Sequence, residues 1–276
     1  MTRHIFLAFL LTALVAPVFA AASAPCVLPR DLLAIYDNVA TASPAEFGRM
    51  RLRVETFMTN CPAGPADAAS RAVFFDLVTR ESTTDFSAQM KRAAGDDEAN
   101  ARWEAIMTFQ NDLSTYLDSI VGRSDIAYKS TILRFGSGRA IAALGPAAKA
   151  DVIAAATSAG KLSGFEHHHN PQQAAFDAIG EWIDPSNHDF DAHDKAQLNA
   201  LLVRAIDTAD GVVHPGMHQA VMVALARAAG HSDDPRAAAA LRRFTARLQH
   251  KGGEVFESAN HSADQVDARV RAKHNG

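Results

Sequence analysis

The sequence contains few of the residues that favour β-sheets. Its 276 residues include only 2 tryptophans and 3 tyrosines, and apolar and polar residues rarely alternate along the chain. Because aromatic and β-branched side chains favour strands, this scarcity argues against a sheet protein. Alanine, the strongest helix former, is abundant instead. The composition therefore predicts an all-α fold.

An excess of positive charge is also missing. Lys and Arg together number 27 against 31 Asp and Glu, which gives a formal net charge of −4 at pH 7. Proteins that bind the phosphates of nucleic acid present basic surfaces. Beyond residue 20, no apolar run reaches the length of about 20 residues that a membrane-spanning helix needs. We therefore expect neither a nucleic-acid partner nor a chain that spans a membrane.

Complete catalytic motifs are absent as well. The sequence has no G-x-S-x-G nucleophile elbow, no H-E-x-x-H zinc motif and no glycine-rich phosphate loop. The stretch "FGSGRA" at residues 135–140 lacks the spacing of a nucleophile elbow. A binding role is therefore favoured over an enzymatic one, and no cofactor is expected apart from the zinc ion considered below.

The first 20 residues, "MTRHIFLAFLLTALVAPVFA", have the features of a secretory signal peptide. Arg3 supplies a positive start, residues 5–15 are apolar, and Ala20 fits the small-residue rule at a cleavage site. A membrane anchor is disfavoured because Pro17 interrupts the apolar run. We expect residues 1–20 to be removed and the protein to be exported, either to a periplasm or as a secreted protein.

Only two cysteines are present, Cys26 and Cys61. In an exported chain, two cysteines with none left over predict one disulfide bond. A redox-active pair is disfavoured, because the C-x-x-C spacing that lowers a thiol pKa is absent. Pro25 beside Cys26 also departs from the pattern of a lipid-modified cysteine. We expect a structural disulfide within a helical N-terminal region, residues 21–122.

Start signals for helices recur along the chain. Ser43, Pro44 and Glu46 form a capping box with proline at the first helical position. Further starts are predicted at Asn170-Pro171, at Asp234-Pro235 and at Ser262. Apolar residues between these signals follow the helical period, as in the series Leu198, Leu201, Leu202, Ala205 and Ile206.

After about Ser137 the predicted helices come in pairs. The steps from Pro171 to Pro215 and from Asp194 to Asp234 are each roughly 40 residues. The segments "AAFDAIGEW" and "AVMVALARAAG", and the Asp-Pro-Arg before the next helix, resemble HEAT repeats. This resemblance implies that region 123–276 is a short solenoid of stacked hairpins, with a concave surface that holds a protein or peptide. A plain helical bundle is the alternative.

Histidine and aspartate gather in three loops. The first is "FEHHHN" at residues 165–170, and the other two contain the candidate metal ligands His188, Asp191, His193, His214 and His218. Imidazole and carboxylate groups at such spacings can bind zinc, which would make the protein a metal-binding protein or a metal-dependent hydrolase. The alternative is structural, since His, Asp and Asn also cap helices and form turns.

Three arginines fall along one side of a predicted helix, namely Arg236, Arg243 and Arg247. They are candidate contacts for an acidic partner, although a solvated helix face has the same pattern. Together, the sequence predicts an exported helical-repeat protein that binds another protein or peptide, or serves as a scaffold.

Overall fold

The computed structural model describes residues 26–122, 126–158 and 171–275, and within these ranges it contains helices and no strands. The α-helices are α1 (Pro44–Asn60), α2 (Ala68–Thr83), α3 (Ser87–Met90), α4 (Asp96–Ile120), α5 (Lys129–Phe135), α6 (Gly138–Ala143), α7 (Lys149–Thr157), α8 (Pro171–Ile183), α9 (Ala192–Thr208), α10 (Met217–Gly230), α11 (Pro235–Arg247) and α12 (Glu254–Asn275). Short 3-10 segments are η1 (Arg30–Asn38), η2 (Ile126–Tyr128) and η3 (Gly145–Ala148). The all-α prediction is confirmed. The predicted signal peptide lies outside the described residues.

Two of the predicted helix starts are confirmed by their hydrogen bonds. The Ser43 hydroxyl accepts the backbone N–H of Glu46, and the Glu46 carboxylate accepts the backbone N–H of Ser43 at 2.6 Å. Asp234 caps α11 by accepting the N–H of Arg236 at 2.9 Å. These side chains satisfy backbone groups that would otherwise lack partners at a helix start.

The predicted start at Ser262 is wrong, because α12 begins at Glu254 and continues through this residue. Ser262 is buried, and it packs against Gly230 at the end of α10. A Cβ atom at Gly230 would lie only 2.9 Å from the Ser262 hydroxyl oxygen. Ser262 therefore supports the close approach of α10 and α12, and the capping pattern around it is coincidental.

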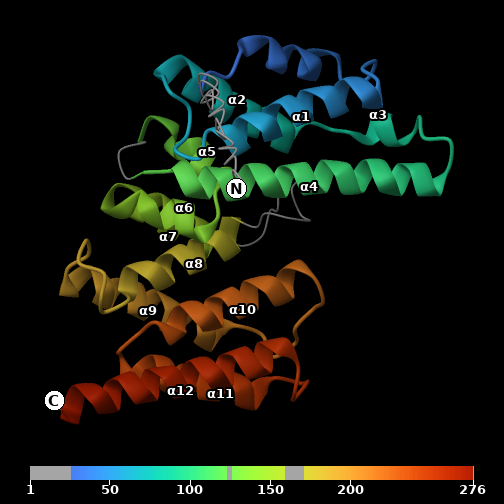
Figure 1. Cartoon of the computed structure of the whole chain (residues 1–276). Coiled ribbons are helices and arrows are strands. Elements are labelled where there is room, and N and C mark those ends of the chain that lie inside the picture. The colour runs from blue at the N-terminus through green and yellow to red at the C-terminus, as the bar shows by residue number, and fades with distance from the viewer. Residues whose placement is uncertain (1–25, 123–125, 159–170, 276) are drawn as a thin grey trace, which may run out of the picture.

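The second half of the chain forms two rows of helices. Helices α6, α8, α10 and α12 contact one another in that order, and α9 contacts α11 (Figure 1). Buried side chains from Leu28 to Val266 form one continuous core. This alternation is the arrangement that stacked helical hairpins produce. The assignment to HEAT repeats stays a prediction. Within the described ranges, no helix combines the length and apolar character needed to cross a membrane.

The predicted disulfide joins Cys26 and Cys61, whose Cα atoms are 5.6 Å apart. This distance is in the usual range for a disulfide bond. The hydroxyl of Tyr116 on α4 donates a hydrogen bond of 2.6 Å to the carbonyl of Cys61. Burial raises the pKa of Tyr116 to about 12, so this donor keeps its proton at any ordinary pH. This hydrogen bond connects the last turns of α4 with the end of α1 and the disulfide.

A buried ion pair lies deeper in the same region. Glu81 on α2 is fully buried, and its two carboxylate oxygens accept from Tyr36 at 2.6 Å and from Arg51 at 3.0 Å. The guanidinium carbon of Arg51 also lies between 5.4 and 5.8 Å from the ring centres of Phe47, Phe86 and Phe109. Burial raises the pKa of Glu81, although Arg51 and Tyr36 favour its ionised form.

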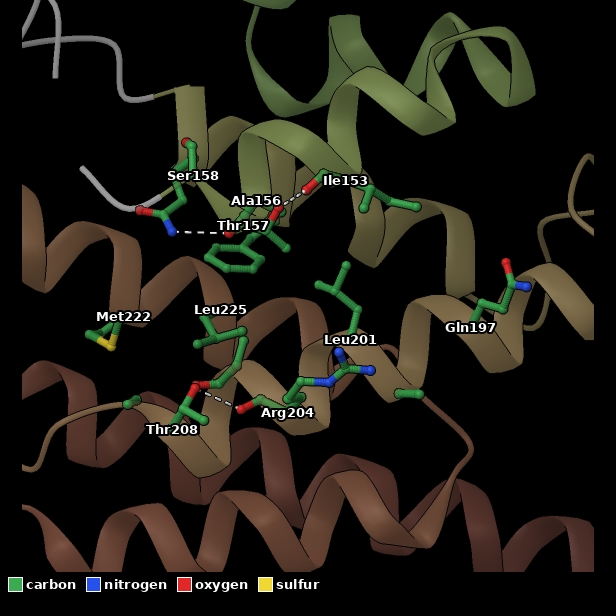
Figure 2. A pocket seen from close by; sticks show the side chains of 15 residues that line it. Ile153, Ala156, Thr157, Ser158, Gln197, Leu201, Arg204, Thr208, Met222 and Leu225 are labelled. Atoms are coloured by element: carbon green, nitrogen blue, oxygen red, sulfur yellow. Dashed lines mark hydrogen bonds between the residues drawn. The ribbon is translucent and has the colours of Figure 1, made fainter. Parts of the chain in front are cut away.

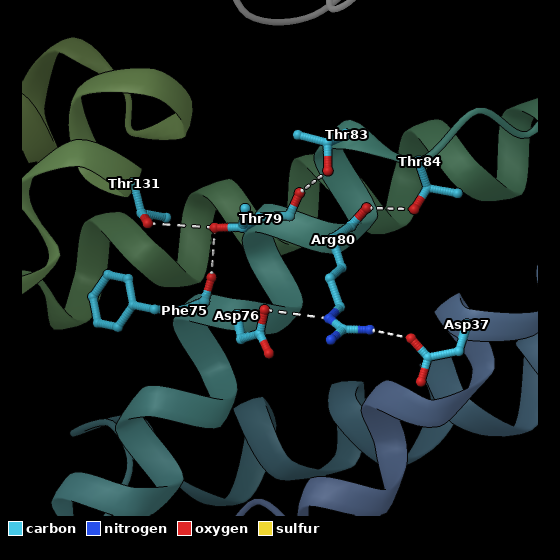
Figure 3. A network of polar contacts seen from close by, with 8 residues as sticks. All are labelled: Asp37, Phe75, Asp76, Thr79, Arg80, Thr83, Thr84 and Thr131. Carbon is cyan, nitrogen blue, oxygen red and sulfur yellow. Dashed lines mark hydrogen bonds and ion pairs between the residues drawn. The ribbon is translucent and has the colours of Figure 1, made fainter.

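More exposed polar contacts hold α2 against its neighbours (Figure 3). Arg80 binds Asp76 on its own helix and Asp37 on η1, with the shorter contact, 2.7 Å, to Asp37. The hydroxyls of Thr79 and Thr131 are 3.3 Å apart and connect α2 with α5. Ion pairs as exposed as those of Arg80 contribute less than about 1 kcal/mol each. They fix the orientation of α2 more than they stabilise the fold.

Candidate functional site

A groove with a volume of about 670 Å³ lies between α7, α8, α9 and α10. Phe176 and Leu225 are buried at its base, and the partly exposed side chains of Ile153, Leu201 and Met222 form its walls. Figure 2 shows these wall residues around the hollow, with Leu201 near its centre. The volume is within the range of about 300–1,000 Å³ that is typical of ligand pockets.

The groove is open because small side chains line it. Ala156 on α7 and Ala200, Ala205 and Ala209 along α9 present only methyl groups. These short side chains leave the space between α7 and α9 unfilled. A helix pair that had to be packed tightly here would need longer apolar residues at these positions.

One continuous face of α9 runs along the groove. Its members are Gln197, Ala200, Leu201, Arg204, Ala205 and Thr208, followed by Ala209 at the C-cap. They alternate in steps of three and one residues, which is the spacing of a single helix face. At a rise of about 1.5 Å per residue, this face is about 18 Å long. The groove is therefore elongated, with space along three turns of helix.

Most polar groups in the groove already have partners within the protein. The hydroxyls of Thr157 and Thr208 donate to the carbonyls of Ile153 and Arg204, at 2.8 and 2.9 Å. The amide of Gln172 donates to the carbonyl of Ala156 at 3.0 Å. A ligand therefore meets a surface that is apolar in effect, because these groups have their main hydrogen bonds satisfied.

Arg204 is the exception. It is exposed, and among the groove residues that the structure describes it is the one with a formal charge. Figure 2 shows its side chain beside Leu201. Within the part of the chain that the structure describes, its guanidinium has no ion pair. The nearest carboxylate along the helix, Asp207, is bound instead by Arg243 through contacts of 2.9 Å to both carboxylate oxygens.

The helices around the groove are held in place by Asp184 at the end of α8. Its carboxylate lies 3.1 Å from Nδ1 of His231, which follows α10, and its carbonyl accepts from Lys195 on α9 at 2.7 Å. Ser186 donates to the same carboxylate from its backbone and its hydroxyl. Burial alone would raise the pKa of Asp184, but the hydrogen bonds from Ser186 and His231 outweigh it and lower the pKa to about 2.

We expect Asp184→Asn to reduce stability by about 1 kcal/mol at neutral pH, because the lost hydrogen bonds to a charged group are partly screened by solvent. A lowered pKa means that the ionised carboxylate stabilises the folded state above its ordinary pKa. The difference between Asp184→Asn and the unmodified protein should therefore shrink below about pH 4 and vanish only below about pH 2. Urea unfolding at several pH values measures this. A difference that is constant with pH would contradict the assignment.

The structure places the predicted metal ligands on loops and helix starts. Asp191 caps α9 by accepting the N–H of Asp194 at 2.8 Å, while His188 and His193 are exposed. Nδ1 of His218 accepts the backbone N–H of His214 at 3.1 Å, which occupies one ring nitrogen.

No group of three or more His, Cys, Asp or Glu residues comes together for a metal ion in the ranges that the structure covers. The three histidines of residues 167–169 lie outside the described residues.

The predicted arginine stripe on α11 is occupied by contacts within the protein. Arg236 pairs with the cap residue Asp234 at 2.6 Å, and Arg243 pairs with Asp207. Arg247 donates to the carbonyl of Ile206 at 2.9 Å. A role for these three arginines in partner binding stays a prediction. Because Arg243 binds Asp207, Arg204 has no ion pair among the described residues.

Sequence reasoning did not find the groove, although one signal was present. In the apolar series on α9, Leu198, Leu202 and Ile206 are buried in the core, whereas Leu201 and Ala205 are partly exposed in the groove. The apolar face of α9 is therefore wider than packing against the core alone requires. Such width in an amphipathic helix indicates a second apolar surface.

Comparison with protein-family models finds no match. No curated protein and no solved structure is significantly similar to the chain.

Proposed function

We propose that this protein is an exported binding protein, and that the groove between α7, α8, α9 and α10 holds an apolar segment of a partner protein or peptide. The observation that carries this proposal is the elongated, alanine-lined face of α9 with partly exposed Leu201, Ile153 and Met222 around it. Exposed apolar grooves of this kind are typical of interaction sites.

The shape of the groove favours a chain segment over a compact molecule. An amphipathic helix that lies in a groove presents apolar side chains at steps of three and four residues. The groove face of α9 repeats with the same steps over about 18 Å, so two or three turns of a bound helix could pack along it. Polar groups that are already hydrogen-bonded, such as Thr157 and Thr208, would not be left unsatisfied when the segment excludes water.

Export is supported by the N-terminal sequence and by the disulfide. Residues 1–20 match the pattern of a signal peptide, and a disulfide between Cys26 and Cys61 is stable in an oxidising compartment. The proposed partner would then also be found outside the cytosol, in the periplasm or among secreted proteins.

The proposal is tested by panning a random 12-residue peptide library, displayed on phage, against the protein. Ala200→Trp places a large side chain in the groove, so peptides selected on the unmodified protein should lose binding to this variant. Ala272→Trp adds the same side chain at an exposed position on α12 and is the control. Selected peptides that bind all three proteins equally, or a library that yields no binders, would overturn the proposal.

A further inference from the structure

We infer that the segment bound in the groove carries an acidic side chain within its apolar face, and that this carboxylate binds Arg204. The inference rests on the proposed function, because it concerns the ligand of the same groove. It commits to a peptide or protein segment with one Asp or Glu among apolar residues.

The charge distribution of the groove carries the inference. Among the residues of the described ranges that line it, Arg204 is the one cation and none is acidic. Arg204 lies near the middle of the groove face of α9, seven residues after Gln197 and five before Ala209. A partner segment that lay along this face would therefore pass the guanidinium, and a wholly apolar segment would remove water from it without compensation.

The neighbours of Arg204 on its own helix do not satisfy it. The residues three and four positions before it are Leu201 and Ala200, and the residue four positions after it is Thr208, so none of them supplies a negative charge. The remaining neighbour, Asp207, is bound on both oxygens by Arg243. The ion pair that would otherwise form within α9 is thus replaced by one to α11, and Arg204 stays available.

A second cation near the groove is already neutralised. Lys149 at the start of α7 binds Asp194 and also donates to Gln197 at 2.9 Å. An incoming carboxylate would have to displace Asp194 to reach this lysine, whereas Arg204 can form two parallel hydrogen bonds without breaking any contact in the described structure. The acidic residue of the ligand is therefore expected opposite Arg204.

The test is a change of selectivity with a change of charge. The same 12-residue library is panned on the unmodified protein, on Arg204→Gln and on Arg204→Glu. Peptides from the unmodified protein should be enriched in Asp or Glu between apolar residues. The enrichment should disappear on Arg204→Gln and change to Lys or Arg on Arg204→Glu, because a specificity switch needs a repulsive as well as an attractive element. Arg271→Glu, at an exposed position on α12, controls for the change in net charge.

A selected peptide and its Glu→Gln or Asp→Asn counterpart are then titrated against the unmodified protein by fluorescence anisotropy. We expect the neutral peptide to bind about five- to tenfold more weakly, the range for a charge-assisted hydrogen bond at a partly exposed site. On Arg204→Gln the two peptides should bind alike.

The two proposals can fail separately. Peptides that lose binding to Ala200→Trp, but are equally acidic whether selected on the unmodified protein, Arg204→Gln or Arg204→Glu, would overturn this inference. The proposed function would still stand. Peptides that are insensitive to Ala200→Trp would overturn both.

Discussion

Replacing Arg51 with methionine is expected to destabilise the protein by about 3–5 kcal/mol at neutral pH, the range for removing one partner of a buried ion pair. Glu81 has no exposed surface, so its carboxyl group would be left in an apolar environment with only the Tyr36 hydroxyl to bind it. Methionine can still pack against the phenylalanine rings that surround Arg51, which limits the loss from packing alone. Equilibrium unfolding in urea measures the difference.

The loss should depend on pH in a direction set by Glu81. Its pKa in the folded protein is raised, first of all by burial, and Arg51 is one of the groups that oppose this rise. Without Arg51 the pKa rises further, so the carboxyl takes up a proton more readily in the folded state than in the unfolded chain. The cost of Arg51→Met is therefore largest where Glu81 is ionised, and it should decrease as the pH falls through the raised pKa.

Two further variants separate the charge effect from a general loss of side-chain volume. Arg53→Met removes an exposed pair with Asp31 and should cost less than about 1 kcal/mol. Adding Glu81→Leu to Arg51→Met removes the unpaired charge and should recover much of the lost stability. A double variant that is as unstable as Arg51→Met alone would show that packing, and not the buried charge, causes the effect.

Loss of the disulfide should have an effect of similar size. The bond joins residues 35 positions apart in the sequence, and the chain-entropy relation gives about 3–4 kcal/mol for a loop of this length. Replacing both Cys26 and Cys61 with serine should lower the melting temperature and leave the helix content below the transition unchanged. Thermal unfolding followed by circular dichroism measures both quantities.

A reducing agent provides the control for this prediction. It should lower the melting temperature of the unmodified protein to nearly that of the double serine variant, and it should leave the variant unaffected. The interaction of Tyr116 with the Cys61 carbonyl involves the backbone, so it is retained in the variant. Equal melting temperatures with and without the disulfide would mean that its loop is already restricted in the unfolded chain.

Local signals predicted the helical fold because they depend on neighbouring residues. The capping box at Ser43 and Glu46 and the cap at Asp234 are formed by side chains within three residues of the groups that they bind. Ser262 shows the limit of such signals. It has the same local pattern, but it lies inside α12 and is packed against Gly230.

The groove could not be predicted from the sequence, because its charge and polarity depend on which side chains have no partner within the folded protein. In the sequence Asp207 lies three residues after Arg204, so an ion pair within α9 would be expected. In the fold Asp207 instead pairs with Arg243 on α11, and Arg204 then has no ion pair among the described residues. The histidine clusters were more conspicuous in the sequence than the groove residues. In the structure, however, Asp191 and His218 accept hydrogen bonds from backbone N–H groups near helix starts.

The location of a bound segment tests the central claim most directly. Hydrogen–deuterium exchange followed by mass spectrometry would be recorded for the protein alone and with the most enriched 12-residue peptide. The account predicts slower exchange in α7 and α9, which form opposite walls of the groove, and no change in α1 or α2. Protection confined to helices outside the groove, or no protection at saturating peptide, would contradict it.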